Sequence, residues 1–216
     1  MKNDSTSERR PRGRPRGFDS TRALDQALEV FWRLGYEGAS IADLTKAMGI
    51  TAPSLYAAFG SKAELYRRVL ERYQARQGAS TSRAFTEEPT ARATVERMLR
   101  EAARDFSSGK HPPGCMISTA VLTCAEENQP VAEHVASLRA NSLAALRARI
   151  EQGISQGELP AGTDAVALSR YFGAVFQGMS VQAQDGASKT ELLALVEIAM
   201  LAWDKVVQRS SPPRGR

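Results

Sequence analysis

Hydroxyl-bearing and basic side chains gather between residues 40 and 62 in a pattern that suits binding to a nucleic acid. Thr51 and Ser54 carry short hydroxyl groups, Tyr56 carries a phenol and Lys62 carries a positive charge. Short side chains at a helix N-terminus can approach base edges closely, while hydroxyl groups and lysine bind phosphate. Simpler roles stay open: helix capping for the two short hydroxyl residues, core packing for Tyr56, and a solvated surface charge for Lys62.

Two short helices with a tight turn between them are expected to carry these side chains. Ser40 has the features of an N-cap, and Asp43 three residues later makes a weaker version of the capping box. Gly49 lies in the turn, and Thr51 can cap a second helix that tolerates Pro53 in its first turn. This arrangement is typical of a helix-turn-helix, whose second helix lies in the major groove of DNA.

The remainder of the chain also predicts helices. Apolar residues recur at helical spacing from Asp19 to Gly35, a natural C-terminal stop, and Ser61 with Glu64 forms a full capping box before another helix. Residues 78–89 interrupt the periodicity with Gly, Ser and Thr. Further helices are expected at 90–108, 115–126, 130–156, 163–184 and 188–208. No segment alternates with the period of a strand, so the predicted fold class is all-α, with about nine helices.

The charge of the chain is concentrated at its ends. The 216 residues carry a formal net charge of +5, and residues 1–18 alone hold six basic and two acidic side chains. Such basic tails suit contacts with phosphates, although they often only increase solubility. No run approaches the roughly 18 apolar residues of a membrane span, and the charged N-terminus lacks the apolar stretch of a secretory signal. We therefore expect a cytoplasmic protein.

The N-terminal arm contains Arg12-Gly13-Arg14-Pro15, which resembles the core of the AT-hook minor-groove motif. An extended Arg-Gly-Arg backbone can lie in a narrow A·T minor groove, where negative potential attracts arginine. The alternative is a flexible basic tail that adds only sequence-independent affinity through counterion release. Arg12 and Arg14 are thus candidate DNA-binding residues.

Residues 19–73 resemble the N-terminal domain of the TetR (tetracycline repressor-like) family of transcriptional regulators. The matching stretches, which keep their order and spacing, are 27–32, 35–40, 41–49, 54–56 and 59–62. The resemblance implies a three-helix DNA reader followed by helices that form a ligand pocket and, through the last two, a dimer interface. Together with the composition of the arm, the break after residue 77 and the basic end, it predicts four parts: a disordered basic arm (1–18), a helix-turn-helix domain (19–77), a helical effector-binding and dimerisation domain (78–208) and a basic tail (209–216).

The same resemblance assigns DNA contacts and a function. Seven residues would touch the duplex: Ser40, Tyr56 and Lys62 at phosphates, and Thr51, Ala52, Pro53 and Ser54 at or near the bases. The implied function is a homodimeric, sequence-specific DNA-binding regulator, a repressor released from a palindromic operator by a small-molecule effector. We expect neither a cofactor nor enzymatic activity, because the sequence lacks a phosphate-binding glycine loop, a nucleophile–base motif and a set of metal ligands.

The effector half offers only candidates for ligand and dimer contacts. Apolar or polarisable residues that could line a pocket, or simply belong to the core, are Met98, Phe106, Met116, Tyr171, Phe172, Phe176 and Met179. Tyr171 and Gln177 could supply polar contacts. No cluster of acidic side chains favours a cationic ligand over a neutral apolar one. Candidates for the dimer surface, about half of which could instead be buried in the protomer, are Phe176, Val181, Leu192, Leu195 and Ala199.

Cys115 and Cys124 raise a second possible function, a thiol- or redox-responsive regulator. If both lay on the helix expected over 115–126, they would project from opposite faces with a rise of about 13.5 Å between them. That separation is too large for a disulfide. Modification of a single thiol or an intermolecular bond stays open, beside the simpler role of small buried hydrophobic residues.

Overall fold

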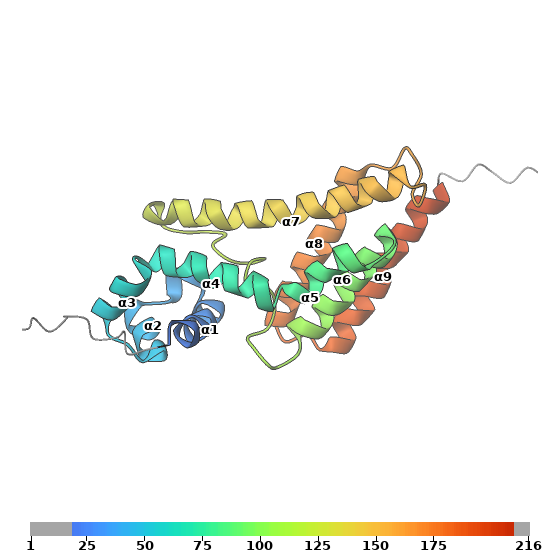
Figure 1. Ribbon diagram of the computed structural model, residues 1–216. Helices are drawn as coiled ribbons and strands as arrows, with labels where there is room; N and C mark the ends of the chain where they lie inside the picture. Colours follow the sequence, from blue (N-terminus) through green and yellow to red (C-terminus); the bar gives the residue numbers. More distant parts are fainter. Residues whose placement is uncertain (1–18, 210–216) are drawn as a thin grey trace, which may run out of the picture.

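The computed structural model describes residues 19–209, in which nine α-helices and one short 3-10 helix account for all regular secondary structure (Figure 1). The all-α class predicted from the sequence is confirmed. The elements are α1 (Ser20–Gly38), α2 (Ile41–Met48), α3 (Ala52–Phe59), α4 (Lys62–Arg76), α5 (Ala79–Glu87), α6 (Ala91–Phe106), η1 (Glu126–Asn128), α7 (Gln129–Ser155), α8 (Ala165–Gln184) and α9 (Lys189–Arg209). Within this part of the chain, no helix is long and apolar enough to cross a bilayer.

Side-chain caps define the ends of the first helices. Ser40 and Asp43 form a complete reciprocal box at the start of α2, in which each side chain binds the backbone N–H of the other. The Ser61 hydroxyl accepts a hydrogen bond from the Glu64 backbone N–H at the start of α4. Ser40 and Asp43, which were predicted to form the weaker capping box, therefore form both of its hydrogen bonds. Gly49 ends α2 in the left-handed conformation that glycine adopts without strain, with φ at 65°.

The first four helices share a compact aromatic core. Phe31 and Tyr36 of α1 lie against Tyr66 of α4, with ring centroids 4.8 Å and 5.1 Å from it. On the outside of the same helix pair, Arg72 of α4 binds both carboxylate oxygens of Asp25 on α1. This bidentate contact lowers the pKa of Asp25. The two helices that support α2 and α3 are thus joined by both apolar packing and a charged contact.

The remaining helices form a second layer of packing. Helix α6 packs against α5, α8 and α9, and Phe172 of α8 meets Trp203 of α9 in the interior. In Figure 1, α1–α4 lie at one end of an elongated molecule, while α7 extends along its length. The C-terminal half is therefore a helical body packed around α6, and its all-helical character agrees with the family resemblance.

Two expectations about local structure are wrong. Residues 79–87 are helical although Gly, Ser and Thr made them look irregular, because Ala84 is fully buried where α5 packs on α6. Residues 107–125, by contrast, form turns and bends rather than the helix expected over 115–126. Gly114 and Val121 have positive φ angles of 77° and 47°, which a helix cannot accommodate.

Candidate DNA-binding surface and effector cavity

Helix α3 has one face in the core and another in solvent. Leu55 and Phe59 are almost completely buried and hold the helix against the reader domain. The Tyr56 side chain, one residue from Leu55, is 49% exposed. Tyr56 is therefore not a core residue, and its phenol is free to reach a neighbouring molecule.

The N-terminal turn of α3 presents the four residues to which the family resemblance assigned base contacts. Thr51 and Pro53 are exposed, and Ala52 and Ser54 are half-buried. The Thr51 hydroxyl accepts a hydrogen bond from the Ser54 backbone N–H at 3.4 Å and lies 3.0 Å from the Ser54 hydroxyl. Capping and DNA contact are compatible, because a hydroxyl oxygen has two lone pairs and its proton can rotate.

Ser40 lies at the start of α2 with its side chain already occupied. Its hydroxyl donates to a carboxylate oxygen of Asp43 at 2.5 Å, and this bond is the main reason that the pKa of Asp43 is lowered. A phosphate approaching Ser40 would therefore meet a carboxylate beside it. The helix N-terminus favours a phosphate at this position, whereas the Asp43 charge opposes it.

Lys62 is held in place at the start of α4. Its ammonium group lies 4.5 Å from the centroid of the Tyr36 ring, and the side chain is half-buried. Burial lowers the pKa of Lys62, and the nearby Glu37 carboxylate opposes this shift. Lys62 is thus a positioned charge rather than a freely solvated one, with its ammonium directed by an aromatic face.

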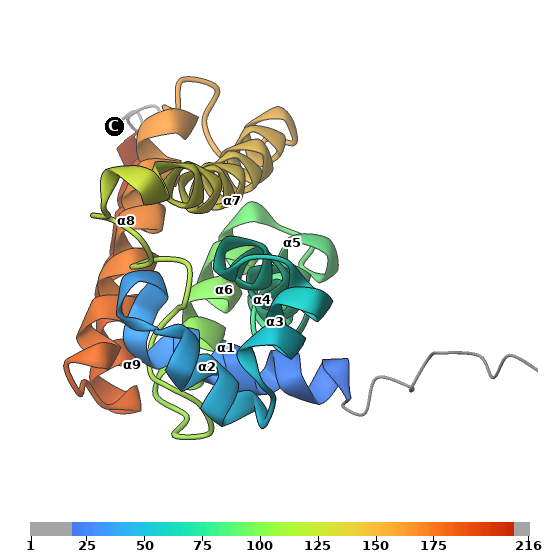
Figure 2. The same cartoon turned by 90° about the vertical axis from the view of Figure 1, so that its left-hand side faces the viewer.

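These residues share one end of the molecule. Figure 2 views that end, with α1, α2 and α3 gathered there beside α4. The short helices α2 and α3 meet at the turn that contains Gly49, as in a helix-turn-helix. The two arginines of the predicted minor-groove motif, Arg12 and Arg14, lie outside the described residues.

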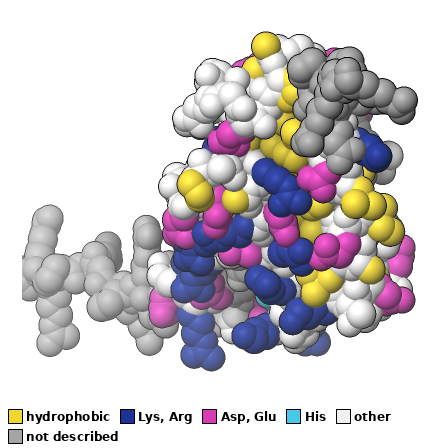
Figure 3. All heavy atoms as spheres, turned by 90° about the vertical axis from the view of Figure 1, so that its right-hand side faces the viewer, with side chains coloured by type: hydrophobic (Ala, Val, Ile, Leu, Met, Phe, Trp, Pro, Cys, Tyr) yellow, Lys and Arg dark blue, Asp and Glu magenta, His cyan; other side chains and the backbone are white. Residues whose placement is uncertain are grey.

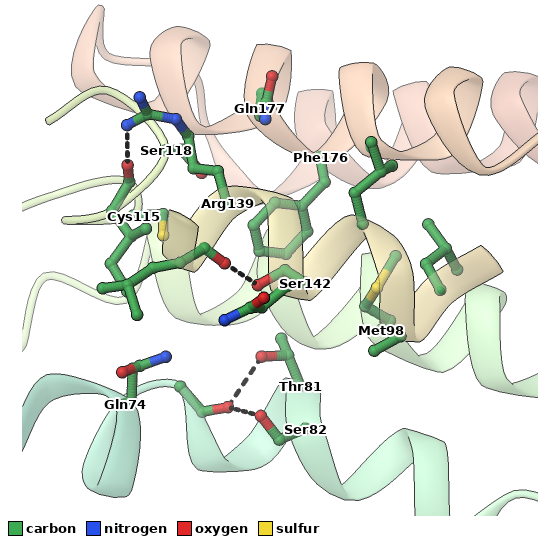
Figure 4. A pocket seen from close by; sticks show the side chains of 18 of the residues that line it. Gln74, Thr81, Ser82, Met98, Cys115, Ser118, Arg139, Ser142, Phe176 and Gln177 are labelled. Atoms are coloured by element: carbon green, nitrogen blue, oxygen red, sulfur yellow. Dashed lines mark hydrogen bonds between the residues drawn. The ribbon is translucent and has the colours of Figure 1, made fainter. Parts of the chain in front are cut away.

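A cavity of about 460 Å³ lies between α4 and the helices that follow it (Figure 4). Its walls come from α4, α5, α6, α7, α8 and the irregular segment 107–125. Much of the lining is apolar, including Phe85, Met98, Phe106, Ile117, Leu146 and Phe176. Its volume falls in the range of small-molecule sites, roughly 300–1,000 Å³.

Three of the seven ligand-binding candidates line this cavity: Met98, Phe106 and Phe176. Gln177, the polar candidate on α8, also lines it. Met116, Phe172 and Met179 are buried outside the lining, and Tyr171 is 40% exposed on α8. Apolar residues of one helix point in several directions, so their type alone does not separate the face toward the cavity from the face toward the core.

Sequence reasoning missed most of the polar lining. Gln74 comes from the end of α4, Thr81 from the helix that was not predicted, Ser118 from the irregular segment and Arg139 from α7. These residues share no local pattern, since each comes from a different element. The residues that carry the family resemblance end at residue 73, so they identify none of these four lining residues. The only available signal was the expectation that a fold of this family contains a pocket.

Segment 107–125 connects the cavity to the reader. His111 stacks on Trp32 of α1 with ring centroids 4.5 Å apart, and its Nε2 lies 3.1 Å from a carboxylate oxygen of Asp105. At the other end, the Glu37 carboxylate of α1 accepts a hydrogen bond from the Ala125 backbone N–H at 3.1 Å. The segment is therefore attached at both ends to the helix that precedes the helix-turn-helix.

The cysteines do not lie on a common helix, so they do not project from opposite faces of one helix as the sequence predicted. Cys115 is buried, 7% exposed, and lines the cavity, whereas Cys124 is half-exposed with its thiol 3.8 Å from the Gln129 side-chain oxygen. Both are free thiols. In the described part of the chain, no group of three or more acidic, histidine or cysteine side chains could hold a metal ion.

Comparison with known proteins covers both halves of the chain. The family model of bacterial regulatory proteins of the tetR family matches residues 23–69, and that of the tetracyclin repressor-like C-terminal domain matches residues 92–192. The HTH-type transcriptional repressor ComR of Escherichia coli (strain K12) is 34% identical over 96% of this chain and 100% of its own length. The repressor BdcR of the same organism is 28% identical over 87% of this chain and 90% of its own length.

A solved structure gives the same result. A cysteine mutant of the TetR family regulator CifR, complexed with 26-bp double-strand operator DNA, is 43% identical with a TM-score of 0.85. That likeness covers 88% of this chain and 100% of CifR. These findings do not favour a thiol-responsive regulator acting through Cys115 or Cys124. With a helix-turn-helix at one end, a cavity-bearing helical body behind it and these likenesses along its length, the chain belongs to the TetR family of bacterial transcriptional regulators.

Proposed function

We propose that this regulator is a homodimeric repressor that binds a palindromic operator and leaves it when a small molecule occupies the cavity. The observation that carries the proposal is the outward face of α3, where Tyr56 is 49% exposed while Leu55 beside it is buried. A regulator of the same family, 43% identical to this chain, has been solved on operator DNA. A bacterial regulator of this kind binds chromosomal DNA, and this agrees with a cytoplasmic location.

The reader would bind DNA through the N-terminal turn of α3. Thr51 and Pro53 would approach base edges in the major groove, where short side chains allow close contact. Tyr56 and Lys62 would bind phosphates on either side, and Ser40 would add a contact at the start of α2. Phosphate contacts fix the register of the helix, and the α3 residues then supply the sequence preference.

Dimerisation would use the outer face of α8 and α9. Ile198 and Leu201 of α9 are 68% and 60% exposed, and Val181 of α8 is 44% exposed. Figure 3 shows exposed hydrophobic side chains beside charged ones on the face of the molecule opposite the reader. Two residues predicted for this interface, Leu192 and Ala199, are instead buried within the protomer, because their face of α9 packs inward.

Release of the regulator from DNA would follow from the position of the cavity. Its walls include α4, which packs against α1 of the reader, together with α6, α7 and α8. An effector that binds more tightly to one arrangement of these helices shifts the population toward it, by as much as the difference in affinity allows. If that arrangement places the two recognition helices at a spacing other than about 34–36 Å or its multiples, they no longer fit successive major grooves.

Selection from a pool of random duplexes with the full chain tests this function. We expect the enriched sequences to contain an inverted repeat whose half-sites lie about 10 bp apart, or a multiple of that distance, as a two-fold symmetric reader requires. A pool that gains no common sequence after selection would contradict sequence-specific recognition. A single unrepeated half-site would contradict the dimer alone.

A further inference from the structure

We propose that the effector of this cavity is an organic anion, a carboxylate with an apolar body, and that Arg139 of α7 is the residue that binds its charged end. The inference rests on the proposed function in one respect, namely that the cavity is the effector site. It adds the chemical class of the ligand, which the family resemblance does not give.

The charge of the cavity lining is the first argument. Among the lining residues, Asp105 is the only acidic one and Arg139 is the only basic one. Asp105 is paired with His111 at 3.1 Å, and this hydrogen bond is the main reason that the pKa of His111 is raised. Within the described residues, Arg139 forms no ion pair, since its hydrogen-bond partners are the backbone carbonyls of Ile117 and Ala120. The charge that lacks a counterion is therefore positive.

The hydrogen-bond geometry of Arg139 is the second argument. Its Nη1 atom donates to the Ile117 carbonyl at 3.2 Å and to the Ala120 carbonyl at 2.9 Å. A guanidinium has five N–H groups, so the three on Nε and Nη2 have no partner in the described part of the protein. Those two atoms form one side of the planar fork that binds a carboxylate with two parallel hydrogen bonds. The side of the guanidinium suited to a carboxylate is thus the free one.

The remainder of the cavity selects the rest of the ligand. In Figure 4, Arg139 lies beside Ser118 at one end of the cavity, and Met98 lies toward the other end with Phe176 between them. Burying an aliphatic or aromatic group against these side chains removes apolar surface from water, which favours binding. An acid group at one end and an apolar body at the other therefore match the two ends of the site.

The contacts of Arg139 also connect ligand binding to the reader. Ile117 and Ala120 belong to segment 107–125, whose last residue, Ala125, is bound to Glu37 of α1. A carboxylate bound at Nε and Nη2 leaves the two Nη1 hydrogen bonds in place, so the effector would bind a guanidinium that is already attached to this segment. The same side chain thus meets the effector and anchors the segment attached to the reader.

Matched acids and amides test the class of ligand. The full chain is titrated calorimetrically with 4-phenylbutanoate and octanoate, and with the corresponding amides, at one pH and ionic strength. A charged hydrogen-bonded contact predicts that each acid binds about 10- to 100-fold more tightly than its amide. Arg139→Gln should remove this preference while leaving the affinity for the amides unchanged. Arg139→Lys, which keeps the charge without the fork, should retain a reduced preference.

Arg147→Gln serves as the matched control. Arg147 lies on the same helix with its side chain 52% exposed and paired with Glu151, so its loss should leave the preference for acids unchanged. Thermal melts establish that each variant is folded. If Arg139→Gln is unfolded, the proposal is tested by whether Arg139→Lys shows a reduced preference for acids. Equal affinity for acids and amides, an undiminished preference in either Arg139 variant, or no binding of the acids up to about 1 mM would overturn the proposal.

Operator binding by the ligand-free protein is measured on the same preparations. If the protein binds its selected duplex but shows no preference for acids, the ligand class is wrong and the regulator function stands. If the preference for acids is present but the duplex is not bound, the regulator function fails and the anion site stands.

Discussion

At the DNA-binding end, the exposure and contacts of single side chains distinguish surface residues from core residues. Tyr56 is half-exposed beside the buried Leu55, and Lys62 is positioned over the Tyr36 ring. The sequence placed both residues at the candidate surface, but it could not exclude core packing for Tyr56 or free solvation for Lys62. The exposure of Tyr56 and the position of Lys62 depend on how α3 and α4 pack against α1, and the local sequence pattern does not contain this information.

Replacing Tyr56 with Phe tests a phosphate contact through the phenol. The variant keeps the ring and loses only the hydroxyl, so operator affinity should fall about 2- to 10-fold, the value of one hydrogen bond. Because the side chain is half-exposed, the unfolding midpoint in urea should not change. Fluorescence anisotropy with a labelled operator gives the affinity. Unchanged affinity with unchanged stability would show that the hydroxyl does not bind DNA.

His111 predicts a pH dependence of stability. Its Nδ1 lies 2.8 Å from the Pro112 carbonyl and its Nε2 lies 3.1 Å from Asp105, so both ring nitrogens face acceptors and the doubly protonated ring satisfies both. The hydrogen bond to Asp105 raises the pKa of His111, while burial and the Lys110 charge oppose the shift. Stabilisation is therefore complete below the unfolded pKa of 6.5 and is lost as pH rises through the higher folded pKa.

Thermal melts between about pH 6 and pH 8.5 measure this effect. We expect the difference in Tm between the wild type and His111→Gln to shrink as the pH rises. The Trp32 fluorescence should also change over this range, because the His111 ring stacks on its indole. If the difference in Tm grew as the pH rises, the sign of the effect would be reversed. That result would contradict the pairing of a protonated His111 with Asp105.

At the scale of elements, the helices of the reader were predictable and the segment between α6 and α7 was not. Caps such as Ser40 and Thr51 are local signals, and each lies at the helix start that it predicted. Helix α5 was missed because Ser and Thr lower its intrinsic propensity, which the burial of Ala84 overrides. The prediction of a helix over 115–126 was wrong because the apolar residues of this partly buried irregular segment happen to recur at helical spacing.

Gly114 provides a test of how tightly the irregular segment is packed. A Cβ at this position would lie 2.6 Å from the Ser180 backbone oxygen, and its φ is 77°. Gly109 has a similar φ of 69° but nothing within 4 Å of its Cβ position, so it is the matched control. Gly114→Ala should destabilise the fold by about 1–3 kcal/mol more than Gly109→Ala, the usual cost of overpacking. Equal unfolding midpoints in urea would mean that the segment does not pack firmly on α8.

At the scale of the whole molecule, the cavity combines residues from five helices and the irregular segment. Composition suggested apolar candidates, and Met98, Phe106 and Phe176 line the cavity, but the sequence could not show which face of each helix meets it. The charged lining residue Arg139 was not predicted because its role depends on Ile117 and Ala120, about 20 residues away in the chain. The lining of the cavity is therefore set mostly by tertiary geometry, which the local sequence does not contain.

The N-terminal arm gives a prediction that involves the entire DNA complex. Residues 1–18 carry six basic and two acidic side chains, including Arg12 and Arg14. If this arm reads the minor groove, deleting residues 1–16 should weaken binding several-fold more on operators with A·T flanks than on those with G·C flanks. Anisotropy titrations at one salt concentration compare the two duplexes. Equal losses on both would reduce the arm to a source of sequence-independent affinity.

Sequence-specific DNA binding by the full chain is required by every role proposed for α3, the cavity and the dimer. The most direct measurement is the ratio of its affinities for the selected palindromic duplex and for a scrambled duplex of the same composition, at a fixed salt concentration near 0.15 M. Recognition through α3 predicts a ratio of at least about 10³, typical of specific DNA-binding proteins. A ratio near one, with excess random DNA competing as well as the operator, would contradict it.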